Sequence, residues 1–272
     1  MKDIKGKIAV ITGASRGIGR AAAVRLAAAG AVVVPIARSK DKLDALIEEI
    51  RASGGKGEAF ACDLTDPDAT RDALKKIEAQ HGSVDILVNN VGVGTFKPLD
   101  RIPDDEVIGP IMIPVAATLI ACHAVIPGML KRGSGHIVNL TSPSGYFHLP
   151  YMLPYAAARH AIVGMTLSLY EEMRGRGVGV TLMCPPKVNT GYFNANDADL
   201  DWFPRISKLF PTVEPEVVGE KIYKSIVKNQ REVLFPFVTW FFVRYYQTMP
   251  RFTRFFLGIL GLWKPARKDT PK

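Results

Sequence analysis

The feature that most constrains the fold of this chain is a glycine-rich turn at residues 12–19, with the sequence TGASRGIG. An apolar run at residues 8–11 precedes the turn, and an alanine-rich helical pattern at residues 20–29 follows it. A strand, a turn with this glycine spacing and a helix form a phosphate-binding unit, because the helix begins with unpaired N–H groups that face an anion. An ordinary glycine-rich connection is the alternative. The pattern predicts a dinucleotide site that contains Gly13, Ser15, Arg16, Gly17, Ile18 and Gly19.

The rest of the chain continues this alternation of strands and helices. Apolar runs predict further strands at residues 31–36, 56–61, 84–88, 135–140, 178–184 and 232–235. Helical patterns between them cover residues 40–51, 66–81, 104–131, 152–174 and 214–229, with Pro110 and Pro114 interrupting the third of these. This order predicts one doubly wound α/β domain of Rossmann type at residues 1–235, with a mostly parallel seven-stranded sheet and helices on both faces.

The end of the second strand indicates which dinucleotide is bound. An acidic residue there binds a ribose 2′-hydroxyl, whereas an arginine suits a 2′-phosphate. No acidic residue lies between Ala31 and Lys40, and Arg38 is joined by Arg16 of the glycine turn. The sequence therefore favours NADP(H) over NAD(H), with two merely solvated arginines as the alternative. Polar residues also follow the next two strands, at Asp63 and in Asn-Asn-Val-Gly at residues 89–92, where open sheets bind ligands.

Three side chains at residues 142–159 indicate proton chemistry. Ser142 follows a strand, and Tyr155 and Arg159 are four residues apart on a predicted helix, so their side chains share one face. A cation beside a phenol favours the phenolate, and such a tyrosine can exchange a proton with a carbonyl oxygen that a serine holds. Tyr146 and Tyr151 are nearby competitors, which we expect to line the pocket or to pack.

Together, these residues resemble the short-chain dehydrogenase/reductase family over about residues 5–235. The resemblance rests on TGASRGIG, on Asp63 at a strand end, on NNVG at residues 89–92, on the serine thirteen residues before the tyrosine, and on CPPKVNT at residues 184–190. It implies hydride transfer between a carbonyl and a secondary alcohol, with Tyr155 as the acid/base and Ser142 as the oxyanion partner. It further implies that Asp63 meets the adenine, Asn90 the adjacent ribose, and Val188 and Thr190 the nicotinamide end. The implied cofactor site also includes Arg38, Leu64, Gly92, Tyr155 and Arg159.

The chain departs from this family at two linked positions. The family motif is Tyr-x-x-x-Lys, but the fourth residue after Tyr155 is Arg159, and Pro114 occupies the place of an asparagine that holds a relay water. Arginine keeps the positive charge but does not release a proton in a protein, and proline has no side-chain amide. Pro186 also replaces the usual glycine after the sixth strand. Two hypotheses remain: an enzyme whose proton path uses His148, His160 or water, and a dinucleotide-binding sensor or scaffold with little catalysis.

Residues 189–212 match in position the mobile segment that covers the substrate in this family. Their aromatic side chains favour a hydrophobic small-molecule substrate, including lipid-like ones, while a lid packed on its own core is the alternative. These aromatic residues are Tyr192, Phe193, Trp202, Phe203 and Phe210.

The last fifth of the chain, which includes the C-terminal extension at residues 236–272, carries its unusual charge. Residues 1–220 hold 24 Lys and Arg against 24 Asp and Glu, whereas residues 221–272 hold 11 against 2, so the whole net charge of +9 lies there. Residues 233–263 are rich in aromatic residues, but arginines break the apolar runs, so we expect no spanning helix. The mixture predicts peripheral membrane contact through residues 233–272. Subunit contact is the alternative, since the resemblance also implies a homo-oligomer.

Composition limits the remaining classes of partner, metal site and cellular location. The hydrophobic content of 47% allows a full core. The basic region is a tail without a known motif, so we expect no nucleic-acid partner. The three cysteines are far apart and without metal-ligand spacing, which predicts free thiols, no metal and a reducing compartment. Residues 1–20 show no secretory pattern, so we expect a cytoplasmic protein, with the extension placed on the inner face of a membrane.

Overall fold

A parallel sheet forms the centre of the computed structural model, which describes residues 1–196, 198–262 and 264–265. In this part of the chain, one sheet has the strand order β10-β7-β6-β5-β1-β2-β3, and β4 also pairs with β2. All of its strand pairs are parallel. Its strands are β1 (Ile8–Thr12), β2 (Val32–Ala37), β3 (Lys56–Gly57), β4 (Phe60–Ala61), β5 (Ile86–Asn89), β6 (Gly135–Leu140), β7 (Val178–Cys184) and β10 (Glu232–Leu234).

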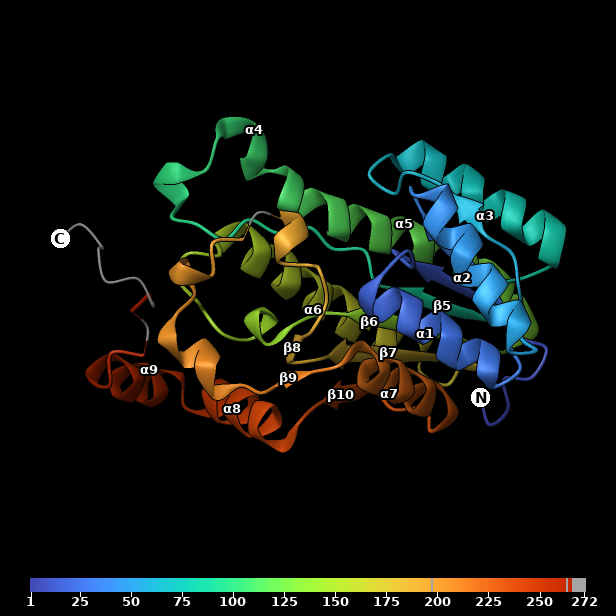
Figure 1. Ribbon diagram of the computed structural model, residues 1–272. Helices are drawn as coiled ribbons and strands as arrows, with labels where there is room; N and C mark the ends of the chain where they lie inside the picture. The colour runs from blue at the N-terminus through green and yellow to red at the C-terminus, as the bar shows by residue number, and fades with distance from the viewer. Residues whose placement is uncertain (197, 263, 266–272) are drawn as a thin grey trace.

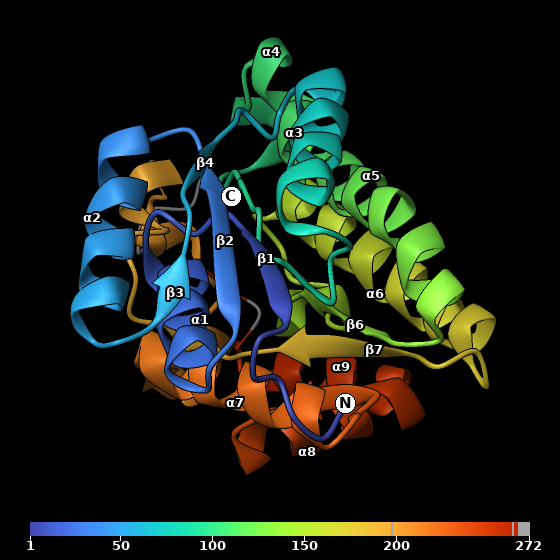
Figure 2. The same ribbon diagram turned by 90° about the vertical axis from the view of Figure 1, so that its right-hand side faces the viewer.

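Helices cover both faces of this sheet (Figures 1 and 2). One face carries α1 (Gly17–Ala28), α2 (Lys40–Ala52) and α7 (Pro215–Val227). The other carries α3 (Pro67–His81), α5 (Gly109–Arg132) and α6 (Leu153–Met173). The core lies in these two layers, because branched strand residues such as Ile11 and Val33 face one layer, and Val10 and Val34 face the other. The predicted Rossmann-type fold is thereby confirmed.

The order of the strands reverses between β1 and β5. The chain runs outward from β1 to β2 and β3, and then returns to place β5 on the other side of β1. At such a reversal the loops that follow the two strands diverge and leave a crevice at the carboxyl end of the sheet. The crevice here lies between the glycine turn after β1 and the loop that begins at Asn90.

Two predicted elements differ in detail. The strand expected at residues 56–61 is split into β3 and β4, which both pair with β2, so the predicted seven strand positions hold eight short strands. The helix expected at residues 104–131 breaks at Ile108, between α4 (Asp104–Val107) and α5. Pro110 therefore sits in the first turn of α5, where a missing N–H is harmless, and buried Pro114 lies inside the helix without ending it.

The segment predicted as a lid is built from short pieces. It contains β8 (Lys187–Val188) and β9 (Thr212–Val213), which pair in parallel as a second small sheet, and three 3₁₀ turns, η3 (Asn194–Asn196), η4 (Leu200–Trp202) and η5 (Arg205–Leu209). The backbone N–H groups of Arg205 and Ile206 donate to the carbonyls of Lys264 and Leu262, at 3.0 Å each. The lid is thus hydrogen-bonded to residues 262 and 264 of the C-terminal extension.

Two helices, α8 (Phe237–Thr248) and α9 (Pro250–Ile259), form the described part of the extension and lie together beside the lid (Figure 1). Both turn a buried face to the protein, through Val243 and Tyr246 in α8 and Thr253 and Leu257 in α9. Their opposite faces carry an aromatic ribbon, in which consecutive rings lie 4.5 to 6.3 Å apart. The ribbon consists of Phe237, Trp240, Phe241, Tyr245, Phe252, Phe256 and Phe255. Trp263 and the basic residues after Pro265, which were part of the same prediction, lie outside the described residues.

Among the described residues, one segment, Asp104–Arg132, is long and apolar enough by length and composition to cross a membrane. It comprises α4 and α5, and α5 packs between α3 and α6 on the sheet.

Candidate active site

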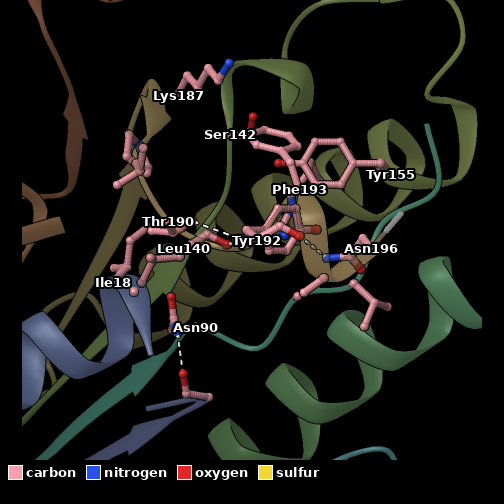
Figure 3. Close-up of a pocket in the computed structure, with 18 of the residues that line it drawn as sticks. Ile18, Asn90, Leu140, Ser142, Tyr155, Lys187, Thr190, Tyr192, Phe193 and Asn196 are labelled. Carbon is pink, nitrogen blue, oxygen red and sulfur yellow. Dashed lines mark hydrogen bonds between the residues drawn. The ribbon is translucent and has the colours of Figure 1, made fainter. Parts of the chain in front are cut away.

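A cavity of about 910 Å³ lies in the crevice at the carboxyl end of the sheet. Of the residues that the sequence predicted for the site, all except Gly19 line it. Gly19 lies directly behind the turn, where a Cβ atom would come within 2.6 Å of the Gly13 carbonyl oxygen. The fold therefore brings the glycine turn, the strand-end residues and the tyrosine helix to one cavity (Figure 3).

The glycine turn is held by the side chain of Asn90. Its Nδ2 donates to the carbonyl oxygens of Gly13 and Thr12 at 3.1 and 3.3 Å, and its own N–H donates to Thr12 Oγ1 at 3.0 Å. Gly13 and Gly17 have φ values of 65° and 55°, in the region that favours glycine. Asn90 was expected to contact a ribose, but its amide N–H₂ group forms hydrogen bonds to the turn.

Arg38 and Asp63 lie at the other end of the cavity, after β2 and β4. Both side chains are exposed, as is Arg16 of the turn. The Thr65 N–H donates to Asp63 Oδ1 at 3.0 Å, and this bond, supported by the charge of Arg38, holds the pKa of Asp63 below its ordinary value. Arg38 and Asp63 are therefore close enough to interact, and a ligand at this end meets both charges.

Ser142 and Tyr155 meet at the middle of the cavity. Ser142 follows β6 and accepts a hydrogen bond from the Ser144 hydroxyl at 3.1 Å, which orients its oxygen. Tyr155 lies in the first turn of α6, where Pro154 occupies an N-terminal position that needs no N–H donor. Both residues line the cavity, and Figure 3 places them on one side of it, with Ile18 and Asn90 toward the glycine turn.

Arg159, one helical turn after Tyr155, is only 6% exposed. Its Nη1 donates to the Leu140 carbonyl oxygen at 3.2 Å, and its Cζ lies 4.8 Å from the centre of the Tyr155 ring. Burial opposes the guanidinium charge, but the phenols of Tyr155 and Tyr192 outweigh it and raise the pKa of Arg159. Arg159 Nε is buried and has no hydrogen-bond partner within the described chain. Such an atom suits a polar ligand group in the cavity.

An aromatic roof covers Tyr155. Phe96 is its centre, with ring centroids 5.0 Å from Tyr155 and 5.2 to 6.4 Å from the three lid residues Tyr192, Phe193 and Phe203. The lid is fastened here, because Asn196 Oδ1 accepts from the Gly94 N–H at 3.0 Å and its Nδ2 donates to the Tyr192 carbonyl at 2.7 Å (Figure 3). Phe96 and Asn196 were not predicted as site residues. Phe96 lies in a loop and Asn196 in the short 3₁₀ turn η3, where no periodicity marks them.

The competing tyrosines and the candidate relay histidines lie elsewhere. The Tyr146 hydroxyl donates to Glu232 outside the cavity, and burial raises the pKa of this phenol. His148 and His160 stack on each other at 5.6 Å and line a second cavity together with Tyr151. In the described chain neither histidine lines the cavity of Tyr155, so the suggested relay through them has no geometric support.

Comparison with known proteins decides the family. The family model for short chain dehydrogenases matches residues 7–201, which is most of the chain. The chain belongs to the short-chain dehydrogenase family. This is a family of oxidoreductases, and the match spans the glycine turn, Ser142, Tyr155 and the first lid residues.

Relatives within the family act on different compounds. Estradiol 17-beta-dehydrogenase 11 of Pongo abelii is 31% identical over 86% of this chain and 76% of its own length. A 3-oxoacyl-(acyl-carrier-protein) reductase of Staphylococcus epidermidis is 36% identical over 71% of this chain and 80% of its own length. Among solved structures, a metagenomic short-chain oxidoreductase in complex with NADP superposes with a TM-score of 0.72, at 33% identity, over 85% of this chain and 96% of its own.

The contact between Gly92 and Arg159 generates a prediction about the site. A methyl group at residue 92 would lie 2.4 Å from Arg159 Nη2, and the buried guanidinium has little room to move. We expect Gly92→Ala to lower the free energy of unfolding by about 1–3 kcal/mol, the usual cost of overpacking. Urea unfolding followed by circular dichroism measures this change.

Gly164→Ala is the matched control. Gly164 lies in α6, and a Cβ atom there would meet nothing within 4 Å. This substitution should leave stability unchanged or raise it by up to about 1 kcal/mol, because alanine is the better helix former. Equal stability of Gly92→Ala and wild type would show that Arg159 is not wedged against the loop after β5.

Proposed function

We propose that this protein is an NADP(H)-dependent oxidoreductase that interconverts a carbonyl and a secondary alcohol on a hydrophobic substrate, with Tyr155 as the acid/base. The observation that carries the proposal is one cavity that is continuous from Arg38 and the glycine turn to Ser142 and Tyr155. A dinucleotide-sized crevice and a proton-transfer pair are the two parts that this chemistry requires.

NADP(H) fits the residues of the cavity. The glycine turn gives a bare backbone cradle, in which a Cβ atom at Gly17 would lie 2.9 Å from Thr190. The guanidinium groups of Arg16 and Arg38 can each donate two hydrogen bonds to a 2′-phosphate. The buried Arg159 Nε supplies a donor for a ribose hydroxyl. When bound, the nicotinamide supplies or accepts the hydride. Binding of NADP by a solved relative supports this cofactor over NAD(H).

Tyr155 and Ser142 provide the proton chemistry. The Ser142 hydroxyl donates a hydrogen bond to the substrate oxygen, and the Tyr155 hydroxyl delivers its proton to that oxygen in reduction, or receives one in oxidation. The charge of Arg159 beside the Tyr155 ring stabilises the phenolate that remains. Because arginine does not release a proton, the proton that restores Tyr155 comes from water at the cavity and not from residue 159.

The aromatic roof supports a hydrophobic substrate. Three of the four roof residues, Phe96, Phe193 and Phe203, have rings that donate no hydrogen bond, and Tyr192 is the fourth. We therefore infer that the substrate part beside the reacting carbonyl is mainly apolar. The relative named estradiol 17-beta-dehydrogenase 11 is consistent with a bulky apolar substrate.

A second candidate function is a dinucleotide-binding sensor or scaffold with little catalysis. The observation that favours it is the joint loss of both relay residues, with Arg159 and Pro114 in their places. Both functions require cofactor binding, and turnover distinguishes them.

Removal of the Tyr155 hydroxyl tests the enzyme. We expect Tyr155→Phe to lower kcat for NADPH oxidation with an apolar ketone by about 100-fold or more, the usual contribution of a general acid. The dissociation constant for NADPH, measured by fluorescence, should stay within about twofold, because the ring remains in place. Tyr170→Phe on the same helix is the control, since Tyr170 lies outside the cavity. Wild-type turnover no higher than that of Tyr155→Phe would favour the sensor.

Charge at residue 38 tests the cofactor. We expect Arg38→Asp to weaken NADPH binding by about 10- to 100-fold, because it removes a charge-assisted bond to the 2′-phosphate, and to strengthen NADH binding. Arg20→Gln is the control, because Arg20 pairs with Glu49 away from the cavity. Calorimetric titration with each dinucleotide measures both affinities, and an unchanged NADPH affinity would assign the 2′-phosphate to other residues.

We also propose peripheral contact of residues 233–272 with the inner face of a membrane, on an otherwise cytoplasmic protein. The aromatic ribbon supports it, because Phe237, Phe255 and Ile259 are 64–75% exposed on helix faces that point away from the protein. Aromatic side chains bordered by Arg251 and Arg254, with no acidic residue from 236 to 265, suit an anionic bilayer surface. A homo-oligomer is a separate proposal, supported by exposed Met112 and Leu119 on α5.

Removal of the ribbon tests the membrane contact. We expect Phe237→Ser with Phe255→Ser to reduce flotation with vesicles of phosphatidylcholine and phosphatidic acid by about tenfold or more, because two apolar side chains no longer enter the bilayer. Met112→Ser with Leu119→Ser is the control, since these residues are 52% and 56% exposed but lie outside the extension. Equal flotation of both double variants would refute contact through the ribbon and leave it as a subunit interface.

A further inference from the structure

A second cavity, of about 1150 Å³, lies at the base of α9. Its lining comes from three separate parts of the chain: residues 97–100, residues 148–160 and the first half of α9. It shares only Leu149 with the cavity of Tyr155, and it occupies the opposite side of the first turns of α6. No residue of the proposed oxidoreductase chemistry lines it.

One side of this second cavity is cationic. The imidazole rings of His148 and His160 stack in parallel at 5.6 Å, and His148 Nδ1 lies 2.6 Å from the Tyr246 hydroxyl. Arg251 and Arg254 border the rings and form no ion pair with any described residue, whereas Lys97 pairs with Glu106 at 3.1 Å. Asp100 is the one acidic residue in the described lining.

These groups repel one another. Burial, the His160 ring and the charge of Arg254 together lower the pKa of His148 below its ordinary value. The positive charges of Arg251 and Arg254 lie at the same cavity, and an anion bound there would stabilise both of them. The two arginines present N–H donors to the cavity, and a group with several oxygens satisfies such donors best. The Nδ1 atoms of the two imidazoles already have partners, the Tyr246 hydroxyl for His148 and the Ala156 carbonyl oxygen at 2.9 Å for His160.

The other side of the cavity is apolar and continues into the aromatic ribbon. Leu99, Leu153 and Phe255 line it and are 50–64% exposed. Phe255 is also the last ring of the ribbon, 5.8 Å from Phe256. A ligand that fills both sides therefore carries a negative headgroup and an apolar chain.

We propose that the second cavity binds the phosphate group of an anionic phospholipid, between Arg251, Arg254 and the two histidines. The proposal rests on the membrane contact proposed above. Because Phe255 belongs to both surfaces, a bilayer against the ribbon brings its headgroups to the mouth of this cavity. The lipid's acyl chains lie along Leu99, Leu153 and Phe255.

Vesicles of equal charge and different headgroup test the site. Wild-type protein should bind phosphatidylcholine vesicles that contain phosphatidic acid about tenfold more tightly than vesicles that carry the same charge as phosphatidylserine, because only phosphatidic acid offers an unshielded phosphate to a bidentate arginine. Arg254→Gln should abolish this preference. Lys264→Gln removes one charge from the same extension outside the cavity, so it should weaken both compositions by the same factor. Equal effects of the two variants would overturn the site and leave only a charged surface.

A soluble probe separates failure of the site from failure of the membrane contact. We expect a short-chain phosphatidic acid below its micelle concentration to shift the imidazole NMR signals of His148 and His160 in wild type but not in Arg254→Gln. Inorganic phosphate should shift them less, because it lacks the acyl chains. If wild type floats with no vesicle but shows this shift, the membrane contact fails and the site stands. If the histidine signals do not move with either probe, the site fails whatever the vesicles show.

Discussion

The hydrogen bonds between the Asn90 amide and the carbonyl oxygens of Thr12 and Gly13 determine the shape of the site. They join the two loops that diverge where the strand order reverses between β1 and β5. Because Asn90 binds the carbonyl oxygens of the turn, the N–H groups at the start of α1 stay available for an anion. A Cβ atom at Gly19 would collide with both partners of this arrangement, at 2.6 Å from the Gly13 oxygen and 2.7 Å from Asn90 Nδ2. The shape of the glycine turn thus depends on one side chain and one glycine.

Arg159 places a buried positive charge beside the Tyr155 ring. Its guanidinium is wider than an ammonium group, and it occupies space that Gly92 leaves open. It is held by the Leu140 carbonyl at the end of β6, so the same strand end positions both Ser142 and the cation beside Tyr155. A buried arginine is a fixed charge, because its proton is not released. In the proposed mechanism, Arg159 supplies the charge beside Tyr155 but no exchangeable proton, and Pro114 in the neighbouring helix has no side-chain amide to hold a relay water.

The sequence predicted the parts of this structure that depend on local patterns. Strand ends, helix periodicity and the spacing from Ser142 to Tyr155 predicted site residues that, except for Gly19, all line the first cavity. Contacts between distant loops left no such signal: Phe96 meets the lid across about a hundred residues, and Asn196 binds Gly94. Pro114 was expected to interrupt its helix, but its burial in the layer between α3 and α6 offsets the lost hydrogen bond. Tertiary packing overrides local preference at such positions.

The lid and the extension are connected by backbone hydrogen bonds and by a ring contact. Residues 205 and 206 of the lid donate to the carbonyls of residues 264 and 262, and Phe210 of the lid packs on Phe242 of α8 at 5.6 Å. Ile206 and Phe210 also line the cavity of Tyr155, so one segment contacts the substrate space on one side and the extension on the other. The lid segment therefore forms part of the cavity wall and also contacts α8.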